Sequence, residues 1–223
     1  MPTVWAIADT HLGFGVGRTM DRFGAEWIDH AVQIRAHCDA VVSADDVLLI
    51  PGDLSWAHER AEAEPDLAWL AALPGIKIVI KGNHDHWWQS DKPLNSPGLL
   101  IPPLVHAGVG FAGTRGWNMP IPDSETFAND RRTFERERRR LQRSLDAVAY
   151  CSIKIALLHY PPQPFLDILS AANVSVCVYG HVHKNSLPDD EKLAVYGAVL
   201  DGVRCYCVAC DRIGFAPQVV AAF

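Results

Sequence analysis

The stretch IKIVIKGNHD, residues 76–85, is the best starting point for interpreting this sequence. Its first part, Ile76–Ile80, is rich in β-branched side chains and predicts a buried strand. The polar segment Gly82-Asn83-His84-Asp85 follows almost at once. In an open α/β sheet the functional side chains gather where the strands end. This segment is therefore a candidate part of a functional site.

Four other segments repeat the arrangement of an apolar run followed by possible metal ligands. They are Asp9-Thr-His11 after residues 4–8, Gly52-Asp53 after 47–50, His159 after 153–158, and Gly180-His181-Val-His183 after 174–179. Together the five segments supply enough imidazole, carboxylate and amide groups to hold two divalent metal ions. A two-metal hydrolase is the leading interpretation.

Each residue type has a chemical role in such a centre. Asp53 can bridge two ions with its two carboxylate oxygens, and Asn83 can offer an oxygen without adding charge. Two cations about 3.5–4 Å apart can share a hydroxide and hold the oxygens of a phosphate during in-line attack. His84 can donate a proton to the leaving oxygen. We expect the carboxylate of Asp85 to orient the imidazole of His84.

Helical patterns separate the strands. We predict helices over residues 21–38, 61–73, 129–149 and 165–171, and two or three further strands without intervening helices over residues 184–223. The third helix has an apolar stripe of Phe134, Leu141, Leu145 and Val148. This order predicts an α/β fold in which two sheets pack together with helices outside. We expect one domain over residues 1–223, because nothing resembles a linker.

Two segments rich in Pro, Gly, Asn and Asp interrupt this pattern, at residues 90–103 and 113–129. We predict that they are long surface loops around the mouth of the site. Substrate choice is expected to reside there.

Composition narrows the class of protein. An apolar share of 49% and a charged share of 21% are ordinary for a globular protein. The net charge of −6 argues against nonspecific coating of nucleic acid. No signal peptide or membrane-length apolar run is evident, so we expect a cytoplasmic protein that does not enter a membrane.

Three cysteines lie close together, at Cys205, Cys207 and Cys210. A zinc knuckle needs four ligands, and no second Cys or His pair follows at a matching spacing. We therefore favour a strand over residues 203–209 with Cys205 and Cys207 buried on one face. Disulfides are disfavoured in a cytosolic chain.

In content and order, the five segments resemble the calcineurin-like metallophosphoesterase superfamily over positions 9–183. The resemblance implies a four-layer fold in which two packed mixed β-sheets are flanked by helices. It implies that His84 acts near the leaving group with Asp85 as its partner. It also implies one ion held by Asp9, His11, Asp53 and His183, and a second held by Asp53, Asn83, His159 and His181. The metals remain open among manganese, iron, zinc and nickel.

The residues within and around these segments resemble those of a bacterial subgroup of predicted phosphohydrolases. His86 departs from that subgroup, where an aromatic residue such as Tyr is expected. It is either a hydrogen-bonded neighbour of the site, which we favour, or a proton carrier or extra metal contact. Asn83 and Arg115 are the candidate substrate-binding residues, although Arg115 fits a structural salt bridge equally well. Four tryptophans either pack beneath loops, which we favour, or line the pocket: Trp56, Trp87, Trp88 and Trp117.

The expected activity is metal-dependent hydrolysis of a phosphoric ester, with a small monoester as the most probable substrate. A bridging hydroxide would attack phosphorus while His84 assists departure of the alcohol. Seven arginines against four acidic residues make segment 130–146 locally basic. This favours a phosphodiesterase or nuclease as the alternative, although a solvated helix with a Glu135–Arg139 pair is the preferred explanation. A non-catalytic scaffold is a remote alternative, because no ligand position is missing.

Overall fold

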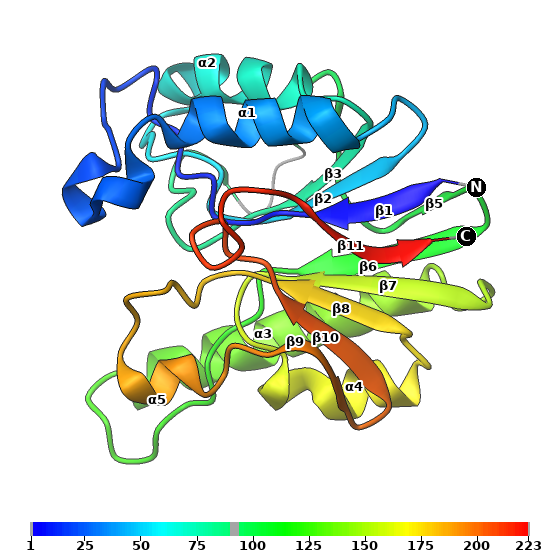
Figure 1. The fold of residues 1–223 in the computed structure, drawn as a ribbon. Helices are drawn as coiled ribbons and strands as arrows, with labels where there is room; N and C mark the ends of the chain where they lie inside the picture. Colours follow the sequence, from blue (N-terminus) through cyan, green and yellow to red (C-terminus); the bar gives the residue numbers. More distant parts are fainter. Residues whose placement is uncertain (1, 90–93, 223) are drawn as a thin grey trace.

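The computed structural model describes residues 2–89 and 94–222, and its strands form two sheets (Figure 1). The first sheet has the order β11-β1-β2-β3-β4. Strands β1 to β4 run parallel, and β11 lies antiparallel along β1. Their bounds are β1 Thr3–Ala6, β2 Val47–Pro51, β3 Ile76–Ile80, β4 Leu99–Leu100 and β11 Gln218–Ala222.

The second sheet has the order β5-β6-β7-β8-β10-β9. Its four central strands are parallel, and both edge strands are antiparallel to their neighbours. Both sheets are therefore mixed, as predicted. The bounds are β5 Leu104–His106, β6 Val109–Thr114, β7 Ile153–Leu158, β8 Val176–Tyr179, β9 Tyr196–Leu200 and β10 Val203–Cys207.

Helices cover the outer faces of both sheets. Helices α1 (His30–Val41) and α2 (Arg60–Ala71) lie over the first sheet, and α3 (Phe127–Asp146) and α4 (Leu166–Ala171) lie over the second (Figure 1). The predicted four-layer α/β fold is confirmed. No helix in the described part of the chain is long and apolar enough to cross a membrane.

The alternation of side chains along each strand explains the layers. In β2, Leu49 belongs to the core between the two sheets, together with Leu157 of the second sheet. Its neighbours Leu48 and Ile50 point the other way and pack with residues such as Leu67 of α2. A strand buried on both faces reads as a continuous apolar run. This is why the central strands were predictable.

The parallel pairing of β1, β2 and β3, and of β7 and β8, brings their carboxyl ends to one edge. The two sheets are also joined there, because the Ala8 N–H donates to Val208 O at 2.7 Å and the Cys210 N–H donates to Ala8 O at 3.0 Å. The segments that follow these strands consequently lie beside one another. This edge carries the candidate site.

Several boundaries differ from the predictions. Helix α1 begins at His30, because the segment before it forms two 3₁₀ turns, Asp21–Phe23 and Ala25–Trp27, on either side of Gly24 with φ +152°. A third 3₁₀ turn, Gln163–Phe165, precedes α4. In the described part of the chain after residue 183, strands β9, β10 and β11 follow one another without an intervening helix, as predicted, and the short helix α5 (Pro188–Glu191) precedes them.

The predicted loops are shorter than expected. The first contains β4, and its residues 90–93 lie outside the described residues. The second begins inside β6 and ends inside α3. In contrast, the predicted apolar stripe of α3 is confirmed, because its four members pack in the core beneath the second sheet.

The cysteines are free and buried. Cys205 and Cys207 pack in the core between the second sheet and its helices, whereas Cys210 belongs to the core beneath α1 and α2. The three side chains therefore enter different layers. This arrangement fits the predicted strand and gives no metal knuckle.

Candidate metal centre

The ligand-bearing segments turn sharply where the strands end. Asp9, His11, Asp53 and His181 all have positive φ angles, of +59°, +42°, +53° and +70°. Residues other than glycine rarely adopt this conformation, and they do so mainly where the surrounding structure enforces it. Here the Asp9 N–H donates to Gly52 O and the His11 N–H donates to Asp53 O, at 3.0 and 2.9 Å. The loops after β1 and β2 thus hold each other in the strained form.

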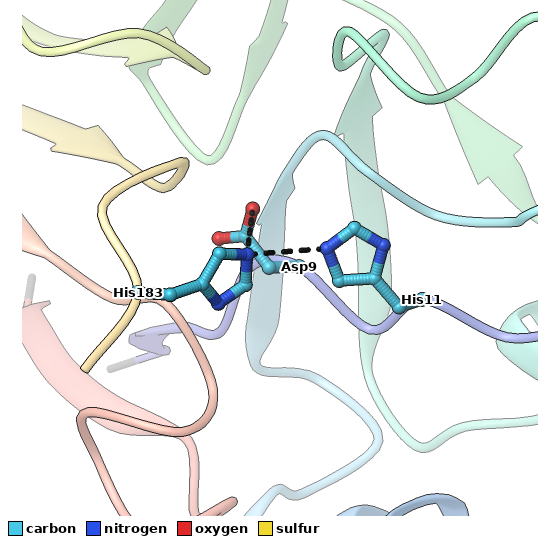
Figure 2. A group of neighbouring side chains, drawn as sticks. All are labelled: Asp9, His11 and His183. Atoms are coloured by element: carbon cyan, nitrogen blue, oxygen red, sulfur yellow. Dashed lines mark hydrogen bonds and ion pairs between the residues drawn. The ribbon is translucent and has the colours of Figure 1, made fainter. Parts of the chain in front are cut away.

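A first group of ligand atoms comes from Asp9, His11 and His183 (Figure 2). The two Nε2 atoms of His11 and His183 lie 3.2 Å apart, and His183 Nε2 lies 3.9 Å from Asp9 Oδ1. One ligand atom from each residue falls within 4.8 Å of the others. The three side chains point at a common position, as metal ligands do.

A second group forms around the side chain of Asn83. Its Oδ1 atom lies 2.7 Å from His159 Nε2 and 2.9 Å from His181 Nδ1. Asp53 connects the groups, because its Oδ2 lies 3.4 Å from His159 Nε2 and 3.6 Å from His11 Nε2. The structure therefore brings together all seven residues that the sequence nominated as ligands.

The protonation of these groups suits metal binding. Burial lowers the pKa of His11 well below its usual value, and lowers the pKa of both His159 and His181 to about 3. These rings are neutral at physiological pH, which is the form that binds metal. Burial also raises the pKa of Asp9, and raises that of Asp53 to about 6. Buried carboxylates beside neutral imidazoles fit one or more divalent cations, which would compensate their charge.

Two glycines allow the loops to approach the ligands closely. Gly52 has φ +95°, and a Cβ there would lie 2.7 Å from His159 Nδ1. At Gly82 a Cβ would lie 2.1 Å from Asp53 Oδ1. Any larger side chain at these positions would displace a ligand.

Asp85 has a different position from the one expected. Its carboxylate accepts hydrogen bonds from the N–H groups of Leu54, Ser55 and Gly82 at 2.9, 3.0 and 2.7 Å, and from the indole of Trp87 at 3.2 Å. The expectation that it orients the imidazole of His84 is not met in this geometry. Asp85 instead ties the loop after β2 to the loop after β3, which makes it a positioning residue.

His84 itself lies at the mouth of the site. Its backbone N–H donates to Asp53 Oδ1 at 2.8 Å, and its half-buried ring lies 4.5 Å from the ring of Trp56. Burial lowers the pKa of His84, and the charge of Asp53 opposes that effect. The ring lines a pocket of about 330 Å³ together with His11 and His183. His84 therefore meets whatever occupies the pocket.

The four tryptophans that were predicted either to pack beneath loops or to line the pocket have different surroundings. Trp56 lines the 330 Å³ pocket, and so does Trp27, which was not nominated. Trp87 and Trp88 stack on each other at 5.6 Å. Trp117 lies 5.1 Å from Tyr160, whose ring lies 4.2 Å from His181.

Arg115 and His86 lie away from the ligand atoms. The Arg115 guanidinium lies 4.6 Å from the Trp117 ring and lines a second hollow of about 310 Å³. The exposed ring of His86 stacks on His58 at 5.4 Å. Neither belongs to the groups of acidic and imidazole side chains among the described residues that could hold a metal ion, which are Asp9 with His11 and His183, and Asp9 with Asp53 and His159.

Asp211 was not predicted from the sequence as part of the site. Its Oδ1 atom lies 3.1 Å from His183 Nδ1, and its Oδ2 accepts from the Lys184 N–H at 2.8 Å. Asp211 holds the His183 ring so that Nε2 faces Asp9 and His11. Its position just after strand β10 was the available signal, since every nominated ligand also follows a strand.

Replacing Asp211 with Asn should weaken metal binding. Partners of metal-ligating histidines typically contribute about 10–100-fold in affinity, and we expect a loss in that range when zinc binding is titrated by calorimetry. Asp201→Asn, at an exposed turn, is the control. Equal affinity in both variants would show that Asp211 does not support the site.

Metal binding should also depend on pH through His183. Burial acts to lower its pKa, but the hydrogen bond with Asp211 and the charges of Asp9, Asp211 and Asp53 outweigh burial and raise it to about 9. Below that pH a metal must displace the proton, so we expect the affinity to fall by up to about tenfold per unit as the pH decreases from 8 to 6.5. An affinity that is independent of pH would contradict this assignment.

The raised pKa of His183 also affects the stability of the metal-free protein. Its effect is opposite to the effect on metal binding, because it favours the fold at low pH. A raised folded-state pKa means that the contribution of His183 to stability is present below pH 6.5 and is lost as the pH rises towards 9. The difference in melting temperature between the protein with metal and the protein without metal should therefore increase as the pH rises.

The fold and the site together define a class of protein. It is a four-layer α/β protein in which carboxylate, amide and imidazole groups that could hold metals cluster at the carboxyl ends of parallel strands. The profile of the calcineurin-like phosphoesterase family matches residues 2–185, and the chain belongs to that family.

The curated relatives include two phage proteins. The chain is 37% identical over 86 residues to the gene 66 protein of Mycobacterium phage D29, and 29% identical over 85 residues to that of phage L5. Each match covers 38% of this chain and 41% of the phage protein. The chain thus aligns with about two fifths of the length of these relatives.

Two solved structures share the fold. A protein of unknown function from Aquifex aeolicus has a TM-score of 0.53 at 16% identity, covering 97% of this chain and 95% of that one. A phosphopantetheinyl hydrolase from Mycobacterium tuberculosis has a TM-score of 0.56 at 18% identity, covering 93% and 89%. At such identities the likeness concerns the fold.

Proposed function

We propose that this protein hydrolyses phosphoric esters with two metal ions. One ion would be held by Asp9, His11, Asp53 and His183, and the other by Asp53, Asn83, His159 and His181. The observation that carries the proposal is the place of Asp53, whose Oδ2 lies within 3.6 Å of His11 Nε2 and 3.4 Å of His159 Nε2. One carboxylate between two groups of ligands is what a dinuclear site needs.

When bound, such ions lower the pKa of a water molecule and offset the charge of a phosphate. The chain supplies the rest of the chemistry. Asn83 adds an oxygen without adding charge, and its neighbour His84 presents an imidazole to the pocket. The hydrogen bond from the His84 backbone N–H to Asp53 Oδ1 fixes the backbone of His84 relative to Asp53.

His84 is proposed to donate a proton to the leaving oxygen. Burial lowers its pKa in the free protein. A phosphate in the pocket brings negative charge near the ring and raises that pKa again, so the ring holds a proton when substrate is present. The proton then passes to the alcohol as the ester bond breaks.

A phosphomonoester is the favoured substrate. The pocket beside His84 has a volume of about 330 Å³, which suits a small molecule. The basic charges of α3 are also partly neutralised, because Arg138 pairs with Asp167 and both Arg136 and Arg140 pair with the buried Glu137. The expected Glu135–Arg139 pair is not among the ion pairs of the described residues.

One observation supports a phosphodiesterase or nuclease as a second candidate. The hollow of about 310 Å³ beside β3 and β6 is lined by one acidic residue, Glu137, and by four cationic residues, which are Lys81, Arg115, Arg140 and Arg143. It begins next to the centre, since Lys81 precedes Gly82 and Arg115 O accepts from the His159 N–H at 3.0 Å. A second anionic group of a longer substrate would be attracted there.

A test combines metal analysis with matched substrates. Metal is removed with a chelator and restored separately as manganese, iron, zinc or nickel. Hydrolysis of 4-nitrophenyl phosphate, bis(4-nitrophenyl) phosphate and single-stranded DNA is then measured. We expect metal-dependent cleavage mainly of the monoester. Cleavage of diesters alone would support the second candidate, and stoichiometric metal without any hydrolysis would support a non-catalytic scaffold.

A further inference from the structure

Two chemically different sets of residues line the pocket beside the candidate metal centre. The polar set, here called the polar end, includes His11, His84, His183 and Asp211. The apolar set, here called the aromatic end, consists of Met20, Phe23, Trp27 and Trp56. A pocket with this division suits a ligand that has an anionic group at one end and a flat apolar group at the other.

Trp56 provides the main flat surface of the aromatic end. The His11 ring stacks on the indole at 4.7 Å with an interplanar angle of 21°. The Cζ atom of Arg18 lies 3.8 Å from the centre of the same ring system. The Nε atom of Arg18 is buried and has no hydrogen-bond partner in the described structure. The indole is therefore fixed in place before any ligand binds.

Phe23 is another ring of the aromatic end, and it comes from a different segment of the chain than Trp56. Its ring is parallel to the Trp56 indole, with an interplanar angle of 7° and centroids 6.5 Å apart. The side chain is 44% exposed although it lines the pocket, whereas Trp27 beside it is 3% exposed. A large exposed aromatic residue next to a site commonly marks a contact with a ligand.

We propose that the aromatic end binds a planar aromatic group carried by the alcohol of the substrate, and so restricts the substrate to aromatic or nucleoside phosphoesters. This inference rests on the proposed function, because it places the phosphate at the polar end. Asn185 and Ser186, which also line the pocket, can hydrogen-bond the edge of a nucleobase. The exposed ring of Phe23 would contact the face of the aromatic group, beside the Trp56 indole on which His11 and Arg18 already lie.

The first test compares two substrates with the same reacting bond. Adenosine 5′-monophosphate and ribose 5-phosphate both release a primary alcohol, and they differ in the base. We expect a kcat/KM at least about tenfold higher for the nucleotide, because stacking of a base on an aromatic side chain contributes on this scale. The difference should reside in KM. Benzyl phosphate against butyl phosphate then distinguishes any aromatic ring from a nucleobase, and a preference in either pair supports the proposal.

Two phenylalanines allow a matched comparison of variants. Phe23→Ala should lose most of the preference for the aromatic substrate. Phe14→Ala is the control, because Phe14 is 50% exposed, contacts Trp69 at 6.1 Å and does not line this pocket. Neither residue is among the proposed metal ligands. The control should retain the preference of the parent protein.

A binding measurement separates this inference from the proposed catalysis. Metal-free protein is titrated with adenosine, ribose, benzyl alcohol and butanol by calorimetry. Tighter binding of an aromatic compound, weakened by Phe23→Ala and unchanged by Phe14→Ala, supports the aromatic end even if no ester is hydrolysed. Hydrolysis without any aromatic preference, together with equal binding of all four compounds, would overturn the inference and leave the proposed function intact.

Discussion

Replacing Asp53 with Asn is expected to abolish phosphoester hydrolysis, with a loss of at least roughly 10³-fold in kcat/KM. Asp53 is the residue that we propose both ions share, so its loss should affect both of them. Asn keeps an oxygen that can accept from the His84 N–H, and the loop should remain in place. Elemental analysis of the purified variant should show that the metal content has fallen together with the activity.

The same variant should behave differently when no metal is present. Burial raises the pKa of Asp53 to about 6, so its ionised form destabilises the metal-free fold as the pH rises from about 4 through about 6. At pH 8 the metal-free Asn variant should therefore melt at a higher temperature than the metal-free parent. Added metal should then stabilise the parent and have little effect on the variant.

Asp46 offers a matched control for a buried aspartate. It accepts hydrogen bonds from the N–H groups of Thr3 and Ser43 and lies at the opposite end of β2 from Asp53. Asp46→Asn should lower stability by about 1–3 kcal/mol and leave the metal content unchanged. If Asp53→Asn retained full metal content and turnover, the dinuclear site would be refuted.

Replacing His84 with Gln is expected to give the second largest effect, a decrease in kcat of about 10²–10⁴-fold with metal content unchanged. The ring faces the pocket and is not needed to complete either group of ligands. Its proposed task is to protonate the leaving oxygen. The variant should therefore bind metal as the parent does and turn over slowly.

The dependence on the leaving group provides the control for this variant. 4-Nitrophenolate is a good leaving group that needs little protonation, whereas an alkoxide needs a proton. The loss in His84→Gln should therefore be much smaller for 4-nitrophenyl phosphate than for an alkyl phosphate. Equal losses for both esters would show that His84 acts on the phosphoryl group or on binding instead of on the departing alcohol.

Much of the centre was predictable because its determinants are local. Each nominated ligand follows a short apolar run, and parallel strands place their carboxyl ends at one edge. The order of Asp9, Asp53, Asn83, His159 and His181 along the chain was therefore sufficient to predict that they meet. The continuous apolar run over residues 47–50 likewise predicted a strand.

The surroundings of the centre were not predictable in the same way. Asp85 was assigned to His84 from adjacency in sequence, yet its carboxylate joins two loops through backbone N–H groups. Asp211 escaped notice because its partner His183 lies 28 positions away in the chain. Substrate choice was predicted to reside in the loops at 90–103 and 113–129, and residues of both segments line the hollow that contains Arg115, whereas Phe23, Trp27 and Asn185 line the pocket beside His84.

The sequence by itself determined the layers of the fold and the chemical identity of the ligands, since both follow from patterns within a few residues of each strand. Only the tertiary structure decided which carboxylate supports which imidazole, and which aromatic rings stand beside the centre. Those contacts join segments far apart in the chain, such as Phe23 with Trp56 and His183 with Asp211. Their geometry depends on how the two sheets and their connecting loops pack, which no local pattern specifies.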